Sequence, residues 1–401
     1  MTEHTNTPAL RFPEFKNDWI EKSFGDFTKT NQGLQIAISN RETQYKEGYY
    51  FYITNEFLKP NSKIKYYIKN PPNSVIANKD DILMTRTGNT GKVITGVHGA
   101  FHNNFFKIKF DNKQYDRLFI YELLKSSKIN NKILSLAGTS TIPDLNHSDF
   151  YSIKSFIPKY EEQQKLGIFF NKLDRQIELE EEKLELLEQQ KRGYMQKVFS
   201  QELRFKDKKD NYYSDWKNCQ LKDLTYYKNG KGYEKVATTN GKYNIINLNS
   251  IGIKGQLKDS GKYTDFEDDT LLKNDLIMIL SDVAKGNLIG MTAIIDEDNK
   301  YLLNQRIALL RIKNSLITNA YFLYLYINFN RKYFINMSAG MSQLNINKKT
   351  VEDFPVNLPN IEEQNKIAIL FKNYEDTIKK QASKVKLLKQ RKQGLLQKMF
   401  V

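Results

Sequence analysis

Residues 88–92 carry the most suggestive chemical motif in the chain, Gly-Asn-Thr-Gly-Lys, which has the look of a phosphate-binding loop. Such a loop needs an earlier glycine for its tight turn and a Ser or Thr after the lysine for magnesium. Arg86 stands where the first glycine belongs, and Val93 replaces the Ser or Thr. No change from strand to helix is evident around the motif, so we interpret it as a turn.

A histidine pair offers a second possibility, metal binding. His98 and His102 are four positions apart, a spacing that places both rings on one face only in a helix, and this stretch contains glycine and has β character. The chain has only two further histidines, His4 and His147, and one cysteine, Cys219. We therefore expect no metal site and no disulfide framework.

Two further stretches could belong to an enzyme that acts on nucleic acid. Residues 70–73, Asn-Pro-Pro-Asn, are close to the Asn-Pro-Pro-aromatic tetrapeptide of adenine-N6 methyltransferases, but Asn73 replaces the aromatic residue that would hold the flipped base. No Phe-x-Gly-x-Gly cofactor loop precedes it. Residues 181–183, Glu-Glu-Lys, could pass for the end of a nuclease motif, but they lie in a helical pattern where a charged face is expected. We expect no catalytic residues.

The charge of the chain favours a polyanionic partner. Lys and Arg number 62 against 46 Asp and Glu, which gives a net charge of +16. Residues 1–156 carry 21 basic and 15 acidic residues, and residues 201–357 carry 23 and 18. Nucleic acid is the partner that this excess suggests first.

Composition also suggests where the protein acts. The hydrophobic fraction of 40% is enough for packed cores. No apolar run approaches the ~20 residues of a membrane-spanning helix, and the N-terminus has no signal pattern. With a single cysteine, these features predict a cytoplasmic protein that does not associate with a membrane.

Any DNA-binding residues must be positioned by the two most regular stretches, residues 157–200 and 358–400. They repeat each other without a gap, 201 positions apart, so that Pro158 corresponds to Pro359 and Glu162 to Glu363. Apolar residues at intervals of three, four and seven predict one long helix in each copy, with a heptad-like seam. The predicted helix–helix seam residues are Leu166, Phe170, Leu173, Ile177, Leu184, Leu187, Tyr194, Val198, Ile367, Phe371, Tyr374, Ile378, Val385, Leu388, Leu395 and Met399.

The two predicted helices differ in charge. Glutamates fill the middle of the first, from Glu178 to Glu188, and lysines fill the second, from Lys379 to Lys392. Opposite charges beside a seam select partners, whereas self-pairing of the first helix would set acid against acid. We therefore expect the two helices to pair antiparallel within one chain.

The repeat extends to each whole half of the chain. Leu10-Arg11-Phe12 and Trp19 open the first half, as Leu203-Arg204-Phe205 and Trp216 open the second. Between opening and helix, β-rich runs dominate, with short helices predicted at 117–132 and 320–332. Residues 103–105 align with residues 304–306.

We predict an α+β protein with two mixed, strand-rich globular domains separated by two long antiparallel helices, related by an internal pseudo-twofold repeat. The expected boundaries are 1–156 for the first globular domain, 157–200 for the central spacer helix, 201–357 for the second globular domain and 358–401 for the C-terminal spacer helix.

This plan resembles the specificity subunit of a Type I DNA restriction-modification system. The resemblance covers nearly the whole chain. Its residues are Leu10 to Phe15 with Trp19, Gly138-Thr139-Ser140 with Ile142 to Asn146, Ile157-Pro158 with Glu161-Glu162-Gln163, Leu344 to Asn347, and Leu358-Pro359 with Glu362-Glu363-Gln364. Residues 339–343, Ala-Gly-Met-Ser-Gln, depart from the Thr-Ile-Pro form of the first half.

The resemblance implies a non-catalytic role in a larger complex. Each globular domain would bind one half of an asymmetric bipartite DNA target, and the helices would set the half-site spacing and dock two modification (methyltransferase) subunits. Those subunits would use S-adenosylmethionine, and two restriction (motor-nuclease) subunits using ATP and Mg can join. This chain itself would hold no cofactor.

Side chains on glycine-containing loops are the candidates for DNA contact, because Arg, Lys, Asn, Gln, Ser and Thr supply base and phosphate contacts. The predicted DNA-binding residues are Arg86, Thr87, Asn89, Thr90, Lys92, Thr139, Ser140, Thr141, Lys228, Lys231, Tyr233, Ser281, Lys285, Asn287, Gln305, Arg306, Ser342 and Gln343. Two alternatives remain open at this point. One is a DNA-binding enzyme with its own methyltransferase or nuclease site, and the other is a coiled-coil scaffold that does not bind DNA.

Overall fold

The chain folds into two compact units, each of which includes a part of both long helices. In the computed structural model, unit 1 comprises Met1–Lys183 and Gln381–Val401, and unit 2 comprises Leu184–Lys380. The described residues are 6–59, 62–138, 142–282, 288–340 and 343–401. Among them, no helix is long and apolar enough to cross a membrane.

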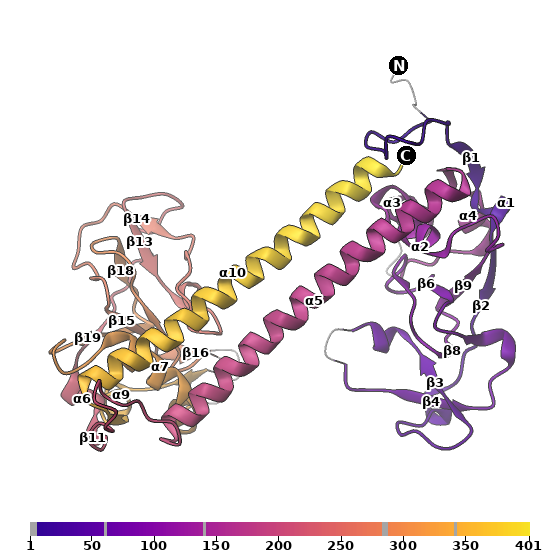
Figure 1. The fold of residues 1–401 in the computed structure, drawn as a ribbon. Helices are drawn as coiled ribbons and strands as arrows, with labels where there is room; N and C mark the ends of the chain where they lie inside the picture. Colours follow the sequence, from indigo (N-terminus) through magenta and orange to yellow (C-terminus); the bar gives the residue numbers. More distant parts are fainter. Residues whose placement is uncertain (1–5, 60–61, 139–141, 283–287, 341–342) are drawn as a thin grey trace. The chain divides into compact units, whose positions relative to one another are not determined.

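Unit 1 contains two four-stranded sheets and a separate strand pair (Figure 1). The first sheet has the order β2 (Lys29–Gln32), β9 (Phe105–Lys109), β6 (Ile82–Thr85) and β7 (Val93–Ile94). The second has the order β4 (Tyr66–Lys69), β3 (Tyr49–Ile53), β8 (Gly99–Phe101) and β5 (Ile76–Ala77), with β3 and β8 parallel. The pair is β1 (Ile20–Ser23) with β10 (Lys154–Ile157).

The short α-helices of unit 1 are α1 (Phe24–Phe27), α2 (Arg117–Lys125), α3 (Ser127–Leu136) and α4 (His147–Ser152). The prediction of a single helix at 117–132 was wrong, because the helix is interrupted at Ser126. Its ψ angle of 144° is not helical, and its side chain caps α3 by accepting from Ile129 N. A serine that caps a second helix in this way ends the first one. The 3₁₀ turns of the unit are η1 (Ile38–Asn40), η2 (Asn55–Leu58) and η3 (Asn73–Val75).

Unit 2 repeats this arrangement. Its main sheet has the order β12 (Thr225–Asn229), β19 (Ile307–Ile312), β15 (Leu276–Ile279) and β17 (Thr292–Ile294). The second sheet has the order β14 (Tyr263–Thr264), β13 (Tyr243–Ile246) and β18 (Tyr301–Leu303), again with a parallel pair, β13 and β18. The remaining pairs are β11 (Lys217–Gln220) with β21 (Pro355–Leu358) and β16 (Ser281–Asp282) with β20 (Leu344–Asn345).

The short helices of unit 2 are α6 (Leu221–Leu224), α7 (Ala320–Phe329), α8 (Lys332–Met337) and α9 (Lys348–Glu352), with the 3₁₀ turn η4 (Leu248–Ser250). Strand register corrects one alignment made from the sequence. Phe105 pairs with Thr85 as Ile307 pairs with Ile279. The counterpart of Phe105 is therefore Ile307 rather than Arg306. The two connections have the same length, three residues each, so the offset between the halves is 202 here rather than the 201 of the long helices.

The long helices are α5 (Tyr160–Phe199) and α10 (Ile361–Met399), of 40 and 39 residues. Their segments pair antiparallel, as the sequence predicted. In unit 1, Phe170 packs on Phe400 and Glu180 binds Gln381 and Lys384. In unit 2, Phe199 stacks on Phe371.

The predicted seam residues range from buried to exposed. Buried are Leu166, Phe170, Ile177, Val198, Ile367, Phe371, Val385 and Met399. Partly buried are Leu173, Leu184, Leu187, Tyr374, Ile378, Leu388 and Leu395. Tyr194 is 41% exposed and packs on Tyr374 at a ring-centroid distance of 5.8 Å.

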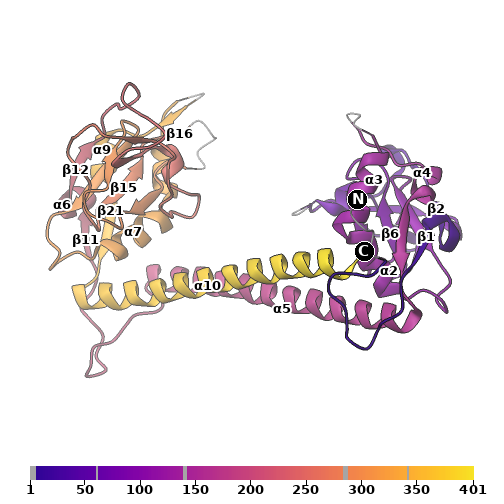
Figure 2. The same cartoon turned by 90° about the horizontal axis from the view of Figure 1, so that it is seen from above.

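The ends of the long helices belong to the domain cores. Leu396, Met399 and Phe400 join the core of unit 1, where the Phe400 ring stacks on Phe119 of α2 at 5.5 Å. In unit 2, Ile367 and Phe371 of α10 join the core that contains Phe322 of α7 (Figure 2). At the helix ends, the seam residues therefore pack on the globular part of each unit as well as on the other long helix.

A buried charge network also holds α10 in unit 1. Lys392 pairs with Glu122 of α2 at 2.8 Å and with Asp174 of α5 at 2.6 Å, and Lys125 pairs with the same two carboxylates. Burial raises the pKa of Glu122 and lowers that of Lys392, as expected when charges leave water. Two lysines against two carboxylates make the network neutral.

Residues that carry the family resemblance form one arginine–glutamate pair in each unit, and this pair fixes the start of the long helix. Arg11 binds Glu162 through two hydrogen bonds, of 2.8 and 2.7 Å, and Arg204 binds Glu363 in the same way, at 2.8 and 2.9 Å. Both glutamates are buried. Each motif therefore ties the opening segment of its half to the first turn of the helix that ends it.

The glutamine that follows each buried glutamate ties the helix to the globular part. Gln163 accepts from the backbone N–H of Asp116 and donates to the carbonyl of Pro158. Gln364 accepts from Asn319 and donates to Pro359. Asp116 and Asn319 are the N-caps of α2 and α7, so these bonds set each short helix against the long one.

The two arginine–glutamate pairs differ in two hydrogen bonds to the glutamate, which leads to a stability prediction. Glu363 also accepts from the indole of Trp216 at 3.1 Å and from the Phe205 amide at 3.2 Å, whereas the buried indole nitrogen of Trp19 has no partner among the described residues. Glu363→Ala should destabilise unit 2 by about 3–5 kcal/mol, because it leaves a partly buried arginine and an indole unpaired. Glu162→Ala should destabilise unit 1 by less.

Amide hydrogen exchange, measured separately in the two units, is the readout. Glu362→Ala, which removes the exposed carboxylate next to Glu363, is the matched control and should change stability by less than about 0.5 kcal/mol. Equal losses of protection for Glu162→Ala and Glu363→Ala would contradict the role given to Trp216 and Phe205.

Candidate nucleic-acid interface

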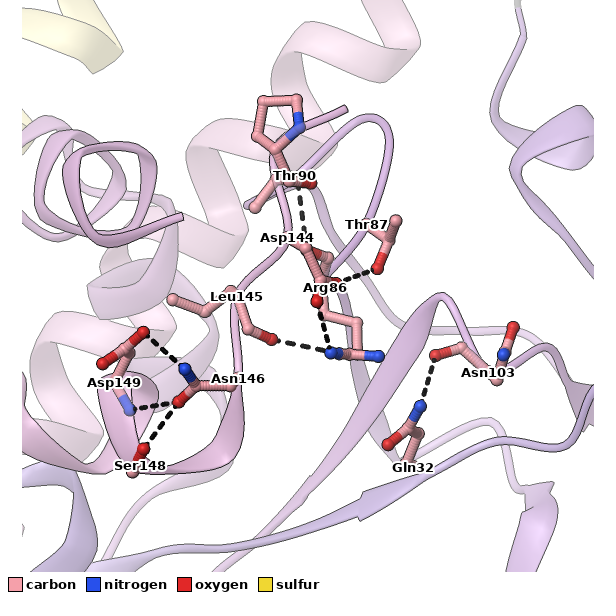
Figure 3. A network of polar contacts seen from close by, with 11 residues as sticks. Gln32, Arg86, Thr87, Thr90, Asn103, Asp144, Leu145, Asn146, Ser148 and Asp149 are labelled. Atoms are coloured by element: carbon pink, nitrogen blue, oxygen red, sulfur yellow. Dashed lines mark hydrogen bonds and ion pairs between the residues drawn. The ribbon is translucent and has the colours of Figure 1, made fainter. Parts of the chain in front are cut away.

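Three loops that are distant in sequence meet at one edge of unit 1. The backbone N–H of Arg86, after β6, donates to the carbonyl of Asn104 at 2.7 Å, and the N–H of Leu145 donates to the carbonyl of Arg86 at 2.9 Å. These two bonds join the β6–β7 turn, the β8–β9 turn and the segment before α4. Figure 3 shows side chains from these three segments. We call this place the loop edge of unit 1.

Two of the predicted DNA-binding residues hold the loop edge together. The Arg86 guanidinium donates to the Leu145 carbonyl at 3.0 Å and to Asp144 at 2.8 Å, and it lies over the Phe106 ring (Figure 3). The Thr87 hydroxyl donates to the same Asp144 carboxylate. In this arrangement both side chains are occupied in fixing the segment before α4.

The rest of the β6–β7 turn is divided between buried and exposed side chains. Thr90 is 8% exposed, and its hydroxyl donates to the carbonyls of Arg86 and Pro143. Asn89 and Lys92 are exposed, and the Lys92 ammonium donates to the Leu58 carbonyl at 3.1 Å. The stretch 88–92 therefore forms a turn between β6 and β7, and no helix follows it. Thr139, Ser140 and Thr141 lie outside the described residues.

A group of amide side chains that the sequence analysis missed lies on the same edge. Gln32 donates to the backbone carbonyl of Asn103 at 3.3 Å, and the Asn103 amide donates to Gln35 at 3.2 Å (Figure 3). The Asn103 side-chain oxygen is buried and has no hydrogen-bond partner among the described residues. The available signal was the Asn103-Asn104 pair at a turn between strands.

Unit 2 has the same loop edge, built by equivalent backbone bonds. The N–H of Leu280 donates to the carbonyl of Arg306 at 3.0 Å, and the N–H of Ile346 donates to the carbonyl of Leu280 at 2.9 Å. Ser281 is buried and its hydroxyl accepts from the Gln343 amide, which links two predicted residues. Lys285, Asn287 and Ser342 lie outside the described residues.

Three predicted residues of unit 2, Lys228, Lys231 and Tyr233, line a hollow of about 470 Å³ in which acids face bases. Lys231 pairs with Asp268 at 2.6 Å, and the buried Tyr233 donates its hydroxyl to the same carboxylate at 3.0 Å. Lys228 pairs with Asp269 at 2.6 Å. The two lysine charges are balanced locally, so this hollow is a poor site for phosphate.

Gln305 and Arg306 are two further predicted residues of unit 2. Both are exposed, and they line a second hollow of about 490 Å³. Gln305 donates to Glu234 at 3.0 Å, whereas the Arg306 guanidinium makes no hydrogen bond or ion pair with any described residue. An unpaired guanidinium is available for a ligand with acceptor groups.

No cluster of three or more His, Cys, Asp or Glu side chains that could hold a metal is found among the described residues. His98 and His102 flank the short strand β8, and Asn73 begins the 3₁₀ turn η3. Both loop edges carry amide groups together with hydroxyl or guanidinium groups, which can form hydrogen bonds to nucleic acid bases and phosphates.

The Asp268 cluster leads to a prediction for acid stability. Hydrogen bonds from Lys231 and the Asp269 amide lower the pKa of Asp268 to about 2. Its folded pKa is thus below its ordinary value of 3.8, so its contribution to stability is present above about pH 4 and is lost as the pH falls towards 2. Asp268→Asn should flatten this part of the stability–pH curve of unit 2.

Urea unfolding of unit 2, followed at pH values from 5 down to 3, is the measurement. Asp376→Asn removes an exposed carboxylate of α10 in the same unit and should leave the slope unchanged. The same slope for wild type and Asp268→Asn would contradict the cluster's role.

Comparisons with known proteins match both halves of this duplicated arrangement. A family model described as Type I restriction modification DNA specificity domain matches residues 16–189 and again residues 213–389. The MjaVIII specificity subunit of a Type I restriction enzyme from Methanocaldococcus jannaschii is 24% identical over 383 residues, which cover 92% of this chain and 88% of that protein.

Two solved structures share the fold. The S subunit of a Type I restriction-modification system from M. genitalium matches with a TM-score of 0.64 at 18% identity, over 98% of this chain and 99% of that one. A chain from a structure that concerns complex assembly and conformational transition of the type I R-M system matches with a TM-score of 0.57 at 15% identity, over 97% and 98% of the two chains.

Proposed function

Because the chain belongs to the family of Type I restriction-modification DNA specificity domains, we propose that it is the sequence-reading subunit of a Type I complex. Each unit binds one half of an asymmetric bipartite DNA target. The observation that carries this proposal is the duplicated loop edge, in which Asn104, Arg86 and Leu145 are joined as Arg306, Leu280 and Ile346 are. The backbone is the same but the side chains differ, which suits two half-sites of different sequence.

The long helices set the distance between the half-sites. A helix of 40 residues rises about 60 Å, which is between one and two turns of DNA. The antiparallel pairing within each unit supports this role, because two packed helices bend less than one. The unread spacer of the target then follows from helix length.

The same helices dock two modification subunits. Four apolar side chains of α5 and α10 are exposed and repeat at the spacing of 201 positions, Ile168 with Ile369 and Leu186 with Leu387. Exposed apolar side chains on long helices suit a partner surface. Their duplication suits two copies of one partner.

Catalysis and cofactors belong to those partners. The modification subunits supply S-adenosylmethionine and methylate adenine, and restriction subunits with ATP and Mg can join to cleave DNA. The chain described here reads sequence, holds no cofactor and acts in the cytoplasm, where the DNA is.

The test is methylation of genomic DNA by the purified modification partner with and without this chain. Methylation at one bipartite motif should require the chain. Equal methylation at that motif without the chain would contradict the proposal. Tight one-to-one binding of S-adenosylmethionine by the chain alone would point instead to an enzyme with its own site.

Helix length yields a sharper prediction. Inserting seven residues after Lys183 in α5 and seven after Lys380 in α10 adds one heptad, which is two helical turns, to each helix. Insertion of whole heptads preserves the seam. The added rise of about 10 Å should lengthen the unread spacer by about three base pairs. Methylome sequencing of cells that express the variant with its partner measures the spacer.

An insertion of the same length between Lys208 and Lys209, in the turn that follows α5, is the matched control and should leave the spacer unchanged. If the variant with insertions in both α5 and α10 keeps a spacer of wild-type length, the helices do not set the distance between the half-sites.

A further inference from the structure

Two turns occupy the same place in the two units and lead into the same central strand. In unit 1 the turn runs from His102 to Phe105, with the Phe105 N–H donating to the His102 carbonyl at 2.9 Å. In unit 2 it runs from Asn304 to Ile307, with the equivalent bond at 3.0 Å. We call these segments the recognition turns.

A glycine holds each recognition turn in position. A Cβ atom on Gly33 would collide with the carbonyl oxygens of Phe101 and His102, and one on Gly230 would collide with those of Leu303 and Asn304. The backbone after β2 and β12 therefore runs directly against the turn. Such contact restrains the start of each turn, so the apex side chains project from a fixed base.

The apex residues differ in chemistry although their backbones agree. Asn103 and Asn104 form the apex in unit 1, and Gln305 and Arg306 form it in unit 2. Asn104 and Arg306 are equivalent, because their carbonyls accept the same bond from the residue after β6 and after β15. A protein that reads two different half-sites with one backbone must place different side chains at equivalent positions.

The first apex residue of each turn supports the second. Asn103 donates to Gln35 at 3.2 Å, and Gln305 donates to Glu234 at 3.0 Å. These bonds anchor each turn to the segment after β2 or β12. Asn104, which is partly exposed, and Arg306, which is exposed and unpaired among the described residues, are left to meet a ligand.

The chemistry of each side chain indicates one base. A guanidinium fork matches the O6 and N7 acceptors of guanine, and a carboxamide matches N6 and N7 of adenine in the major groove. Resting on the proposed function, we infer that Arg306 selects a guanine in the half-site of unit 2 and that Asn104 selects an adenine in the half-site of unit 1.

The test uses the full complex of this chain with its modification partner and a DNA library randomised across both half-sites. Arg306→Asn should lower the preference for guanine at one position of one half-site by about 5- to 150-fold, the range of a bidentate base contact, and leave the other half-site unchanged. Asn104→Arg should abolish the adenine preference at one position of the opposite half-site.

Lys273→Asn is the matched control, since it removes one positive charge from an exposed position of unit 2 outside the recognition turn. It should leave the sequence profile unchanged. If Arg306→Asn instead weakens DNA binding equally for all sequences and makes binding less dependent on salt, Arg306 contacts a phosphate and the assignment is overturned.

Unchanged profiles for Arg306→Asn and Asn104→Arg would also overturn the assignment. In both of these cases a bipartite wild-type profile would leave the proposed function standing. A wild-type complex without bipartite preference would overturn the proposed function and, with it, this inference.

Discussion

A buried arginine–glutamate pair determines how each half of this protein is put together. Arg11 with Glu162 and Arg204 with Glu363 place a charge pair where water is largely excluded, which is tolerated only when the geometry is good and other polar groups are satisfied. Both hydrogen bonds of each guanidinium to the carboxylate are made, and one of the two guanidinium nitrogens also donates to a backbone carbonyl. The pair closes a segment of about 150 residues, so each globular part begins and ends at the first turn of a long helix.

Each long helix has its first turns in one unit and its last turns in the other. The final residues of the chain pack on Trp19 and Phe119 in unit 1, and the end of α5 packs on Phe322 in unit 2. Glu180 and Gln381 supply polar contacts in the helix pair, and Lys392 meets two carboxylates near its end in unit 1. Complementary charges here specify an intramolecular partner, because the glutamate-rich segment of α5 would repel a second copy of itself.

The loop edges show how recognition can vary while the fold stays constant. Backbone bonds join the three loops of each edge, and such bonds do not depend on side-chain identity. Side chains such as Arg86 and Ser281 then hold the edge in ways specific to each unit. The second apex residue of each recognition turn, Asn104 or Arg306, takes no part in the side-chain bonds that anchor the turn and is free to differ, which separates the chemistry of reading from the stability of the unit.

The sequence by itself determined the long helices, their antiparallel pairing, the duplicated half and the family, because periodicity, charge and ungapped repetition are visible along the chain. Tertiary structure alone decided which polar side chains are available. Arg86 and Thr87 are engaged by Asp144, more than 50 residues away, and Tyr233 is buried against Asp268, whereas Asn103 and Gln32 were not selected from the sequence at all. The availability of a polar side chain depends on the partner that folding brings to it, and short-range patterns do not carry that information.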